Sequence, residues 1–200
     1  MSAGPQDDRE GGASGAGPPD GPAPRSQPES ALPFDPIAAA HANWRDHGWD
    51  QPDLMSAATS VVRLHQLLVG RCDGALRRLD LNFARYEVLA LLTFSRTGAL
   101  PMGKVGERLQ VSPASVTNAI DRLEASGFVT RRPHPTDGRA VLAEITDAGR
   151  DVVAAGTAAL VEVDFGLTGL DAARARDLFE LARPVRAAAG DFPDDAPPTA

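Results

Sequence analysis

Apolar residues between Pro52 and Leu79 recur at steps of three and four along the chain. This spacing places them on one face of a helix of about seven turns. The face consists of Leu54, Ala58, Val61, Leu64, Leu68, Cys72, Ala75 and Leu79. The next segment, 83–95, is apolar on all sides, which predicts a buried helix that ends before Gly98.

The segment 101–146 combines two short helices with a β-hairpin. Residues 101–109 predict the first helix, and Ser112 followed by Pro113 predicts the start of the second. The second helix runs to Ala125 and is followed by two β-prone segments, FVTRR and AVLAEIT. A loop containing Asp137-Gly138 joins them into a hairpin. This order of elements is typical of a winged helix-turn-helix.

Long apolar-faced helices flank this winged unit. After a cap at Thr146, one face is predicted to carry Val152, Ala155, Ala159 and Val163. A last helix begins at Asp171, is bent or ended near Pro184, and carries Ala175, Leu178, Leu181 and Val185. These faces exceed what one small core can bury, so we expect a homodimer formed through the N- and C-terminal helices. The predicted fold class is therefore mainly α, with a small β-hairpin wing between dimerisation helices.

The expected domain spans residues 34–190, with N-terminal helices over 34–80, the winged unit over 83–146 and C-terminal helices over 147–190. A short helix with two tryptophans is expected within 35–49. The arm 1–33 is rich in Gly, Pro, Ser and Asp, and we predict that it and the tail 191–200 are disordered. The chain contains no signal peptide or membrane-spanning pattern, so we expect a cytoplasmic protein without a membrane partner.

The charge is unevenly distributed along the chain. The net charge is −7, yet residues 103–140 contain six basic and four acidic side chains, a local balance of +2. A basic segment in an acidic protein fits a DNA-facing patch on a molecule whose other surfaces repel polyanions.

A recognition helix enters the major groove with its N-terminal side chains against the base edges. The expected reading residues are Pro113, Ala114, Ser115, Thr117 and Asn118, with Arg122 further along the helix. The Asn118 amide suits adenine, and the methyl of Ala114 or Thr117 suits thymine. The other face of the helix, with Val116, Ile120 and Leu123, is expected in the core. The alternative is a small polar helix on a solvated surface.

The predicted hairpin carries three arginines. Arg131 and Arg132 lie at its base and are expected near phosphates, whereas Arg139, just past the turn, suits a narrow minor groove. Asp137 lies two residues from Arg139 and is expected to hold an arginine by a charge-assisted hydrogen bond. The alternative is an ordinary exposed hairpin with an incidental ion pair.

The stretch LQVSPASVTNAIDRLEASGFVTRRPHPTDGRAVLAEITDAGR resembles the multiple antibiotic resistance regulator (MarR) family. It carries that family's recognition helix, its Leu-Glu-x-x-Gly-x-x-x-Arg exit and its Asp-x-Arg wing, and the similarity extends more loosely over 54–189. The resemblance implies an obligate dimer on a pseudo-palindromic double-stranded DNA site, usually acting as a repressor. It also matches Arg139 to the arginine that members place in the minor groove.

The resemblance further implies a small effector bound between the dimer helices and the winged unit. The segment before Pro52 resembles the extra helix of the urate-responsive branch, and Trp44, Glu87 and Arg131 match three of that branch's ligand residues. The fourth position, an arginine in that branch, is Ala119 here, so the effector is not assigned. Alternatively, Trp44 packs the extra helix onto the dimer.

Other reactive side chains do not form a recognisable site. Cys72 lies in an apolar stripe, as a core cysteine does, and His41, His47 and His65 lack the spacing of a zinc site. We therefore expect no cofactor and no metal, and, without a nucleophile–base pair, no enzyme. The main alternative to DNA binding is a winged-helix module for protein interaction or dimerisation.

We predict that Arg139→Ala weakens binding to the cognate DNA site by about 1–3 kcal/mol and leaves the dimer intact, because only a groove contact is lost. Fluorescence anisotropy measures the affinity and size-exclusion chromatography the dimer. An unchanged affinity would remove Arg139 from the interface.

Overall fold

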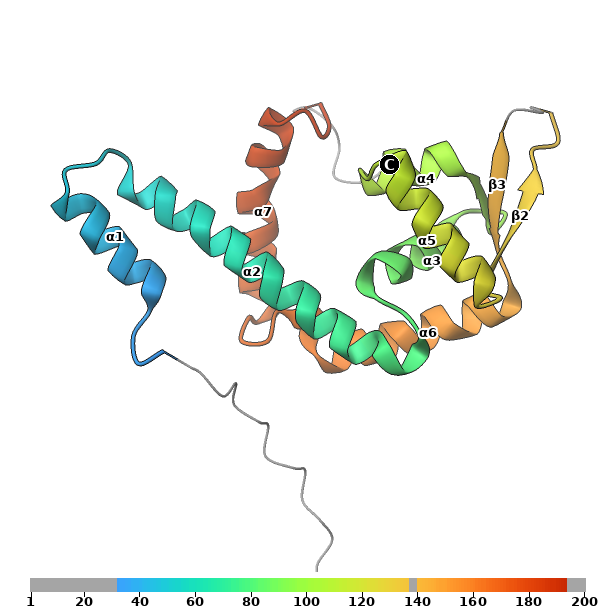
Figure 1. Cartoon of the computed structure of the whole chain (residues 1–200), viewed down its shortest axis with the longest axis horizontal. Helices are drawn as coiled ribbons and strands as arrows, with labels where there is room; N and C mark the ends of the chain where they lie inside the picture. The colour runs from blue at the N-terminus through green and yellow to red at the C-terminus, as the bar shows by residue number, and fades with distance from the viewer. Residues whose placement is uncertain (1–31, 137–139, 194–200) are drawn as a thin grey trace, which may run out of the picture. The chain divides into compact units, whose positions relative to one another are not determined.

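The computed structural model describes residues 32–136 and 140–193. They belong to two units that divide after Pro52, and each is described by itself. The predicted fold class, mainly helical with a small sheet, is confirmed (Figure 1). Residues 1–31 and 194–200 and the wing positions Asp137 and Arg139 lie outside the described residues, so the expectations for them stay predictions.

Within residues 32–51, the first unit contains one helix, α1 (Pro36–Asp46), as expected for this segment. The Asp35 carboxylate caps it by accepting the N–H group of Ile37 at 2.9 Å. Trp44 donates its indole N–H to the carbonyl of Asp50 at 2.8 Å. Its ring meets Trp49 edge-on, with 4.8 Å between the ring centroids. These contacts fold the chain after α1 back onto the helix.

Helix α2 (Pro52–Leu76) begins at the last residue of the first unit and otherwise belongs to the second. It has 25 residues, of which only Cys72 and Leu76 are buried. A 3₁₀ turn, η1 (Arg77–Leu79), leads to α3 (Phe83–Phe94). The Asp73 carboxylate of α2 accepts the Phe83 N–H at 2.8 Å and so joins the two helices. The prediction that α3 is buried is confirmed, since its inner side chains, Tyr86, Val88, Leu89 and Leu92, belong to the core.

The wing is a hairpin of β2 (Val129–Pro133) and β3 (Val141–Ile145), paired antiparallel as predicted. A third strand, β1 (Ala99–Pro101), pairs with the other edge of β3, so the strand order is β1-β3-β2. The sequence did not predict β1, because three residues are too few to show alternation. Pro101 is tolerated because the strand lies at a sheet edge.

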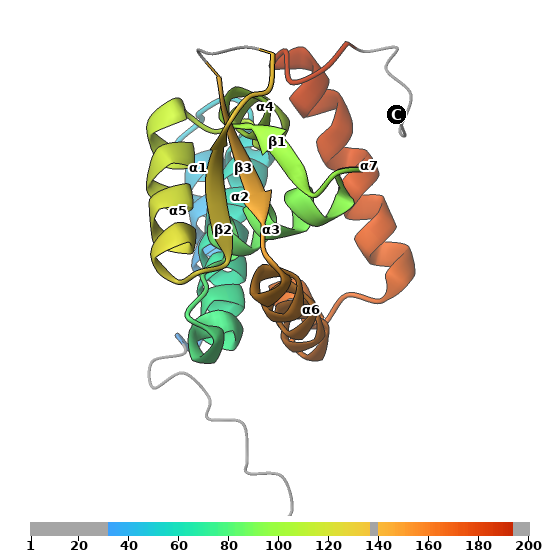
Figure 2. The ribbon, with the colours of Figure 1, turned by 90° about the vertical axis from the view of Figure 1, so that its right-hand side faces the viewer.

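The helix-turn-helix consists of α4 (Met102–Leu109) and α5 (Pro113–Ala125). Ser112 caps α5 as predicted, with its hydroxyl accepting the Ser115 N–H at 3.2 Å. The predicted inner face is confirmed, because Val116, Ile120 and Leu123 are at most 2% exposed. Figure 2 shows α5 alongside β2, and the two elements are in contact.

Helix α6 (Asp147–Glu162) is capped by Thr146 as predicted, and its buried face is offset by one position from the predicted apolar face. Its buried residues are Gly149, Val153, Gly156 and Leu160. A Cβ atom on Gly156 would lie 3.2 Å from Leu76 Cδ2. The two glycines let α6 approach its neighbours closely, and an apolar periodicity does not register glycine as a packing residue.

The chain continues through a second 3₁₀ turn, η2 (Asp164–Gly166), into α7 (Ala172–Ala188). Asp171 caps α7 by accepting the Arg174 N–H at 2.8 Å. Pro184 does not end the helix, which runs on to Ala188. Leu181 and Val185, on the predicted face of α7, remain 73% and 71% exposed. The described chain therefore leaves this face uncovered.

We predict that Gly149→Ala destabilises the fold by about 1–3 kcal/mol, the range for overpacking a core. A Cβ there would overlap the Phe128 carbonyl oxygen and lie 2.8 Å from Ile145 Cγ1. Gly103→Ala in α4 is the matched control, because its Cβ meets nothing within 4 Å. That variant should be unchanged or more stable by up to about 1 kcal/mol. Urea denaturation measures both, and equal effects would contradict the packing account.

Candidate nucleic-acid interface

The first turns of α5 present an exposed row of small side chains. It comprises Pro113, Ala114, Ser115, Thr117 and Asn118, the residues predicted to read the major groove. The row is exposed because the opposite side of the same turns is held in the core by Val116 and Ile120. The structure thus brings the predicted reading residues together on one surface.

The polar atoms of this row differ in whether they already form hydrogen bonds within the protein. Ser115 Oγ lies 2.9 Å from Ser112 Oγ at the cap. Thr117 Oγ1 donates to the Pro113 carbonyl at 3.0 Å, so its hydroxyl can only accept a further hydrogen bond. The side-chain amide of Asn118 forms no hydrogen bond with any other described residue. Its amide can therefore donate and accept together, as pairing with adenine requires.

Arg131 joins the wing to the recognition helix. From β2, its guanidinium forms ion pairs with Asp121 and Glu124 of α5. Its backbone N–H also donates to Glu124 Oε1 at 3.2 Å. Partial burial lowers the pKa of Arg131, but the hydrogen bonds and charges of the two carboxylates outweigh this and raise it. The guanidinium charge is thus paired within the protein, whereas the sequence predicts that Arg131 lies near phosphates.

A role for this arginine was predicted from the sequence, but its two partners were not. Asp121 and Glu124 are three positions apart, so they share one side of α5. That spacing was the available signal. The spacing alone did not show that β2 packs against this side of α5.

The other arginines of this region differ from Arg131. Arg132 forms a cross-strand ion pair with Glu144 of β3, with 2.6 Å between the guanidinium and the carboxylate. Arg122, on the outer side of α5, is exposed and pairs with no other described residue. Arg122 is therefore the recognition-helix cation that remains open to a phosphate.

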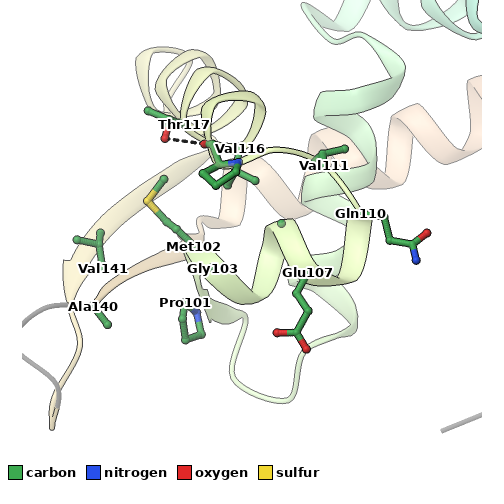
Figure 3. Close-up of a pocket in the computed structure, with 12 residues that line it drawn as sticks. Pro101, Met102, Gly103, Glu107, Gln110, Val111, Val116, Thr117, Ala140 and Val141 are labelled. Atoms are coloured by element: carbon green, nitrogen blue, oxygen red, sulfur yellow. Dashed lines mark hydrogen bonds between the residues drawn. The ribbon is translucent and has the colours of Figure 1, made fainter. Parts of the chain in front are cut away.

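An apolar hollow of about 600 Å³ lies between α4, the start of α5 and β3 (Figure 3). Met102, Val116 and Val141 supply apolar surface, and Glu107, Gln110 and Thr117 add polar atoms. The hollow reaches the wing-side flank of the reading row. It has the size and lining of a small-molecule site.

The three residues matched to a ligand site have separate surroundings. Trp44 belongs to the first unit, where its indole N–H is bonded to the Asp50 carbonyl. Partial burial raises the pKa of Glu87, although much of this side chain is exposed. Arg131 bonds to Asp121 and Glu124 rather than to Glu87.

Cys72 is fully buried, as predicted for a core residue. Burial, with the neighbouring charges of Asp73 and Glu87, raises the pKa of its thiol and so suppresses the reactive thiolate. No cluster of three metal-ligating side chains occurs among the described residues. Within the same residues, no helix is both long and apolar enough to cross a bilayer.

Comparisons with known proteins point to one family. The family model described as MarR matches residues 83–141. The crystal structure of Sco5413, a MarR family transcriptional regulator from Streptomyces coelicolor, is 52% identical and covers 70% of this chain and 97% of its own, with a TM-score of 0.65. Sco3205 of the same organism, solved in complex with DNA, is 24% identical over 70% of this chain and 89% of its own, with a TM-score of 0.64, and shares the fold.

Curated relatives match over a shorter stretch. An HTH-type transcriptional regulator of Mycobacterium tuberculosis, MT0903.1, is 41% identical over 69 residues, which is 34% of this chain and 48% of that protein. The chain thus spans about half the length of the curated relatives it matches first.

We predict that Arg131→Met lowers the free energy of unfolding by about 1 kcal/mol, the scale of partly exposed ion pairs. It should not make the salt dependence of DNA binding shallower, because the guanidinium is already paired with Asp121 and Glu124. Arg122→Met is the matched control and should keep full stability, since the Arg122 side chain forms no hydrogen bond or ion pair with another described residue. Urea denaturation measures the free energy of unfolding, and salt titrations measure the salt dependence of DNA binding. Unchanged stability with a shallower salt dependence for Arg131→Met would make Arg131 a phosphate contact.

Proposed function

The chain belongs to the MarR family of transcriptional regulators, and on this premise we propose that it represses transcription as a homodimer on a pseudo-palindromic DNA site near its own promoter. Small, exposed polar residues at the start of α5 are the observation that carries the proposal. Among them, the Asn118 amide is open to a base, while Val116 and Ile120 anchor the helix from behind. Sco3205, which has the same fold, was crystallised with DNA, and this supports the proposed mode of binding.

Uncovered apolar faces on α2 and α7 support the homodimer. Leu54 and Val61 of α2 and Phe179 and Leu181 of α7 are large apolar side chains that remain exposed. Monomeric soluble proteins rarely leave such patches open. In the proposed dimer, a second copy covers these faces by twofold symmetry. Two recognition helices related by that symmetry would read half-sites about one helical turn, roughly 34 Å, apart.

The proposed effector site is the apolar hollow beside α5 (Figure 3). A ligand seated there would touch Val116 and Thr117 and would alter the flank that faces the wing. A thermal-shift screen of aromatic carboxylates, purines and antibiotics, followed by release from DNA, tests this. Met102→Trp, which fills the hollow, should abolish the shift in melting temperature. A shift that persists in this variant would place the effector elsewhere.

The test of DNA binding is anisotropy with the duplex upstream of the protein's own coding region, at two salt concentrations. We expect saturable binding that weakens as salt rises. Asn118→Ala should weaken binding to this duplex by about 1–3 kcal/mol, the scale of one bidentate base contact, and should affect unrelated DNA less. Asn43→Ala in α1 is the matched control, because it removes an exposed amide from a helix that carries none of the predicted contact residues.

Absence of saturable, salt-sensitive binding would favour the alternative of a winged-helix protein-interaction module. The direction of regulation needs a reporter gene behind the same upstream region. Repression predicts higher expression when the protein is removed, and lower expression would indicate an activator.

A further inference from the structure

A second hollow lies on the other flank of the recognition helix, between α5 and the start of α3. Its volume is about 680 Å³, and it is open to solvent. Its polar lining consists of Asp80, Asn82, Arg85, Ser115, Asn118 and Arg122. The position matched to arginine in the urate-responsive branch is Ala119, which also lines the hollow and leaves it unfilled. The sequence had singled out Arg122 but not Arg85.

The lining of this hollow carries a net positive charge. Arg85 comes from the first turn of α3 and Arg122 from α5, so each of the two helices contributes one cation to the lining. Arg85 Nε donates to Asn82 Oδ1 at 3.2 Å, and a neutral amide does not cancel its charge. Asp80 is the lone carboxylate of the lining and accepts the Ser126 hydroxyl at 3.0 Å. No ion pair joins Asp80 to either arginine among the described residues.

The N-terminal end of α3 adds little positive charge to the hollow. The N–H group of Phe83 donates to Asp73, and that of Arg85 donates to Asn82 Oδ1. Since these groups are already satisfied, the positive charge that the hollow offers to an anion comes from the two guanidinium groups.

The geometry of a duplex brings an anion to this place. The major groove is about 12 Å wide, and a helix with its side chains is about 10–12 Å across. A helix that fills the groove therefore has a phosphate strand along each flank. The wing lies toward one flank of α5, and the hollow with Arg85 and Arg122 forms the other. Asn118 lines the same hollow, so one docked pose serves both the base contact and the phosphate.

We infer that Arg85 and Arg122 together bind one backbone phosphate of the DNA on the flank of α5 that faces α3. This inference rests on the proposed DNA-binding function and adds a contact from outside the helix-turn-helix. The contact reads no base, so it strengthens binding to all duplexes and sets the depth and tilt of α5 in the groove.

The test is the salt dependence of DNA affinity in the full-length protein. The double variant Arg85→Gln/Arg122→Gln should lower the slope of log K against log salt by about 0.9, the value for one phosphate. It should weaken cognate and unrelated duplexes several-fold and to the same extent, so that the specificity ratio is unchanged. Arg85→Lys retains the charge and should keep the slope.

The matched control is Arg96→Gln. Arg96 is exposed and follows the far end of α3, a 12-residue helix about 18 Å long. It should change neither slope nor affinity beyond a general charge effect. Thermal unfolding of each variant separates a binding defect from loss of the Asn82–Arg85 contact, because only the binding defect leaves the melting temperature unchanged.

A double variant that matches Arg96→Gln in slope and affinity would overturn the inference while leaving the proposed function intact. A wild-type protein that binds no duplex would instead overturn the proposed function. Inorganic phosphate supplies a further arm. If it stabilises the wild type but not the double variant, and the DNA slope is unchanged, the hollow is a small-anion site and the inference is wrong.

Discussion

The inner face of α5 packs into the core through Val116, Ile120 and Leu123, and the rest of the interface depends on this packing. Successive helical residues are about 100° apart, so once these three are buried, Ser115 and Asn118 must face outward. Burying each such side chain contributes roughly 1.5–3 kcal/mol relative to leaving it exposed. A rotation of α5 that hid the reading row would expose all three, and the helix therefore has one stable orientation.

Contacts with the neighbouring elements hold α5 in this orientation. Thr146 Oγ1 donates to the Gly127 carbonyl beyond the end of α5 and accepts the Gly149 N–H at the start of α6. Arg131 ties the same helix to the wing through Asp121 and Glu124. The exposed side chains proposed to read DNA thus lie on a helix that is held by contacts within the protein.

Much of this could be predicted from local signals. Ser112 before Pro113 marked the start of α5, and the apolar spacing of its inner face separated core from reading residues. Contacts that depend on the distance between elements escaped prediction. The burial of Gly149 and Gly156 in α6 was not predicted because glycine packs by close approach, and β1 was too short to show a pattern. The partners of Arg131 and the nearness of Arg85 to α5 depend on how separate segments meet in space. No local pattern carries that information.

The central claim is that α5 reads base edges in the major groove of a twofold-symmetric site. Dimethyl sulfate footprinting of the region upstream of the protein's own coding sequence tests it most directly, because the reagent reports guanine N7 in the major groove and adenine N3 in the minor groove. The account predicts guanine N7 protection in two half-sites about one helical turn apart. Protection of adenine N3 alone, or no protection at saturating protein, would contradict it.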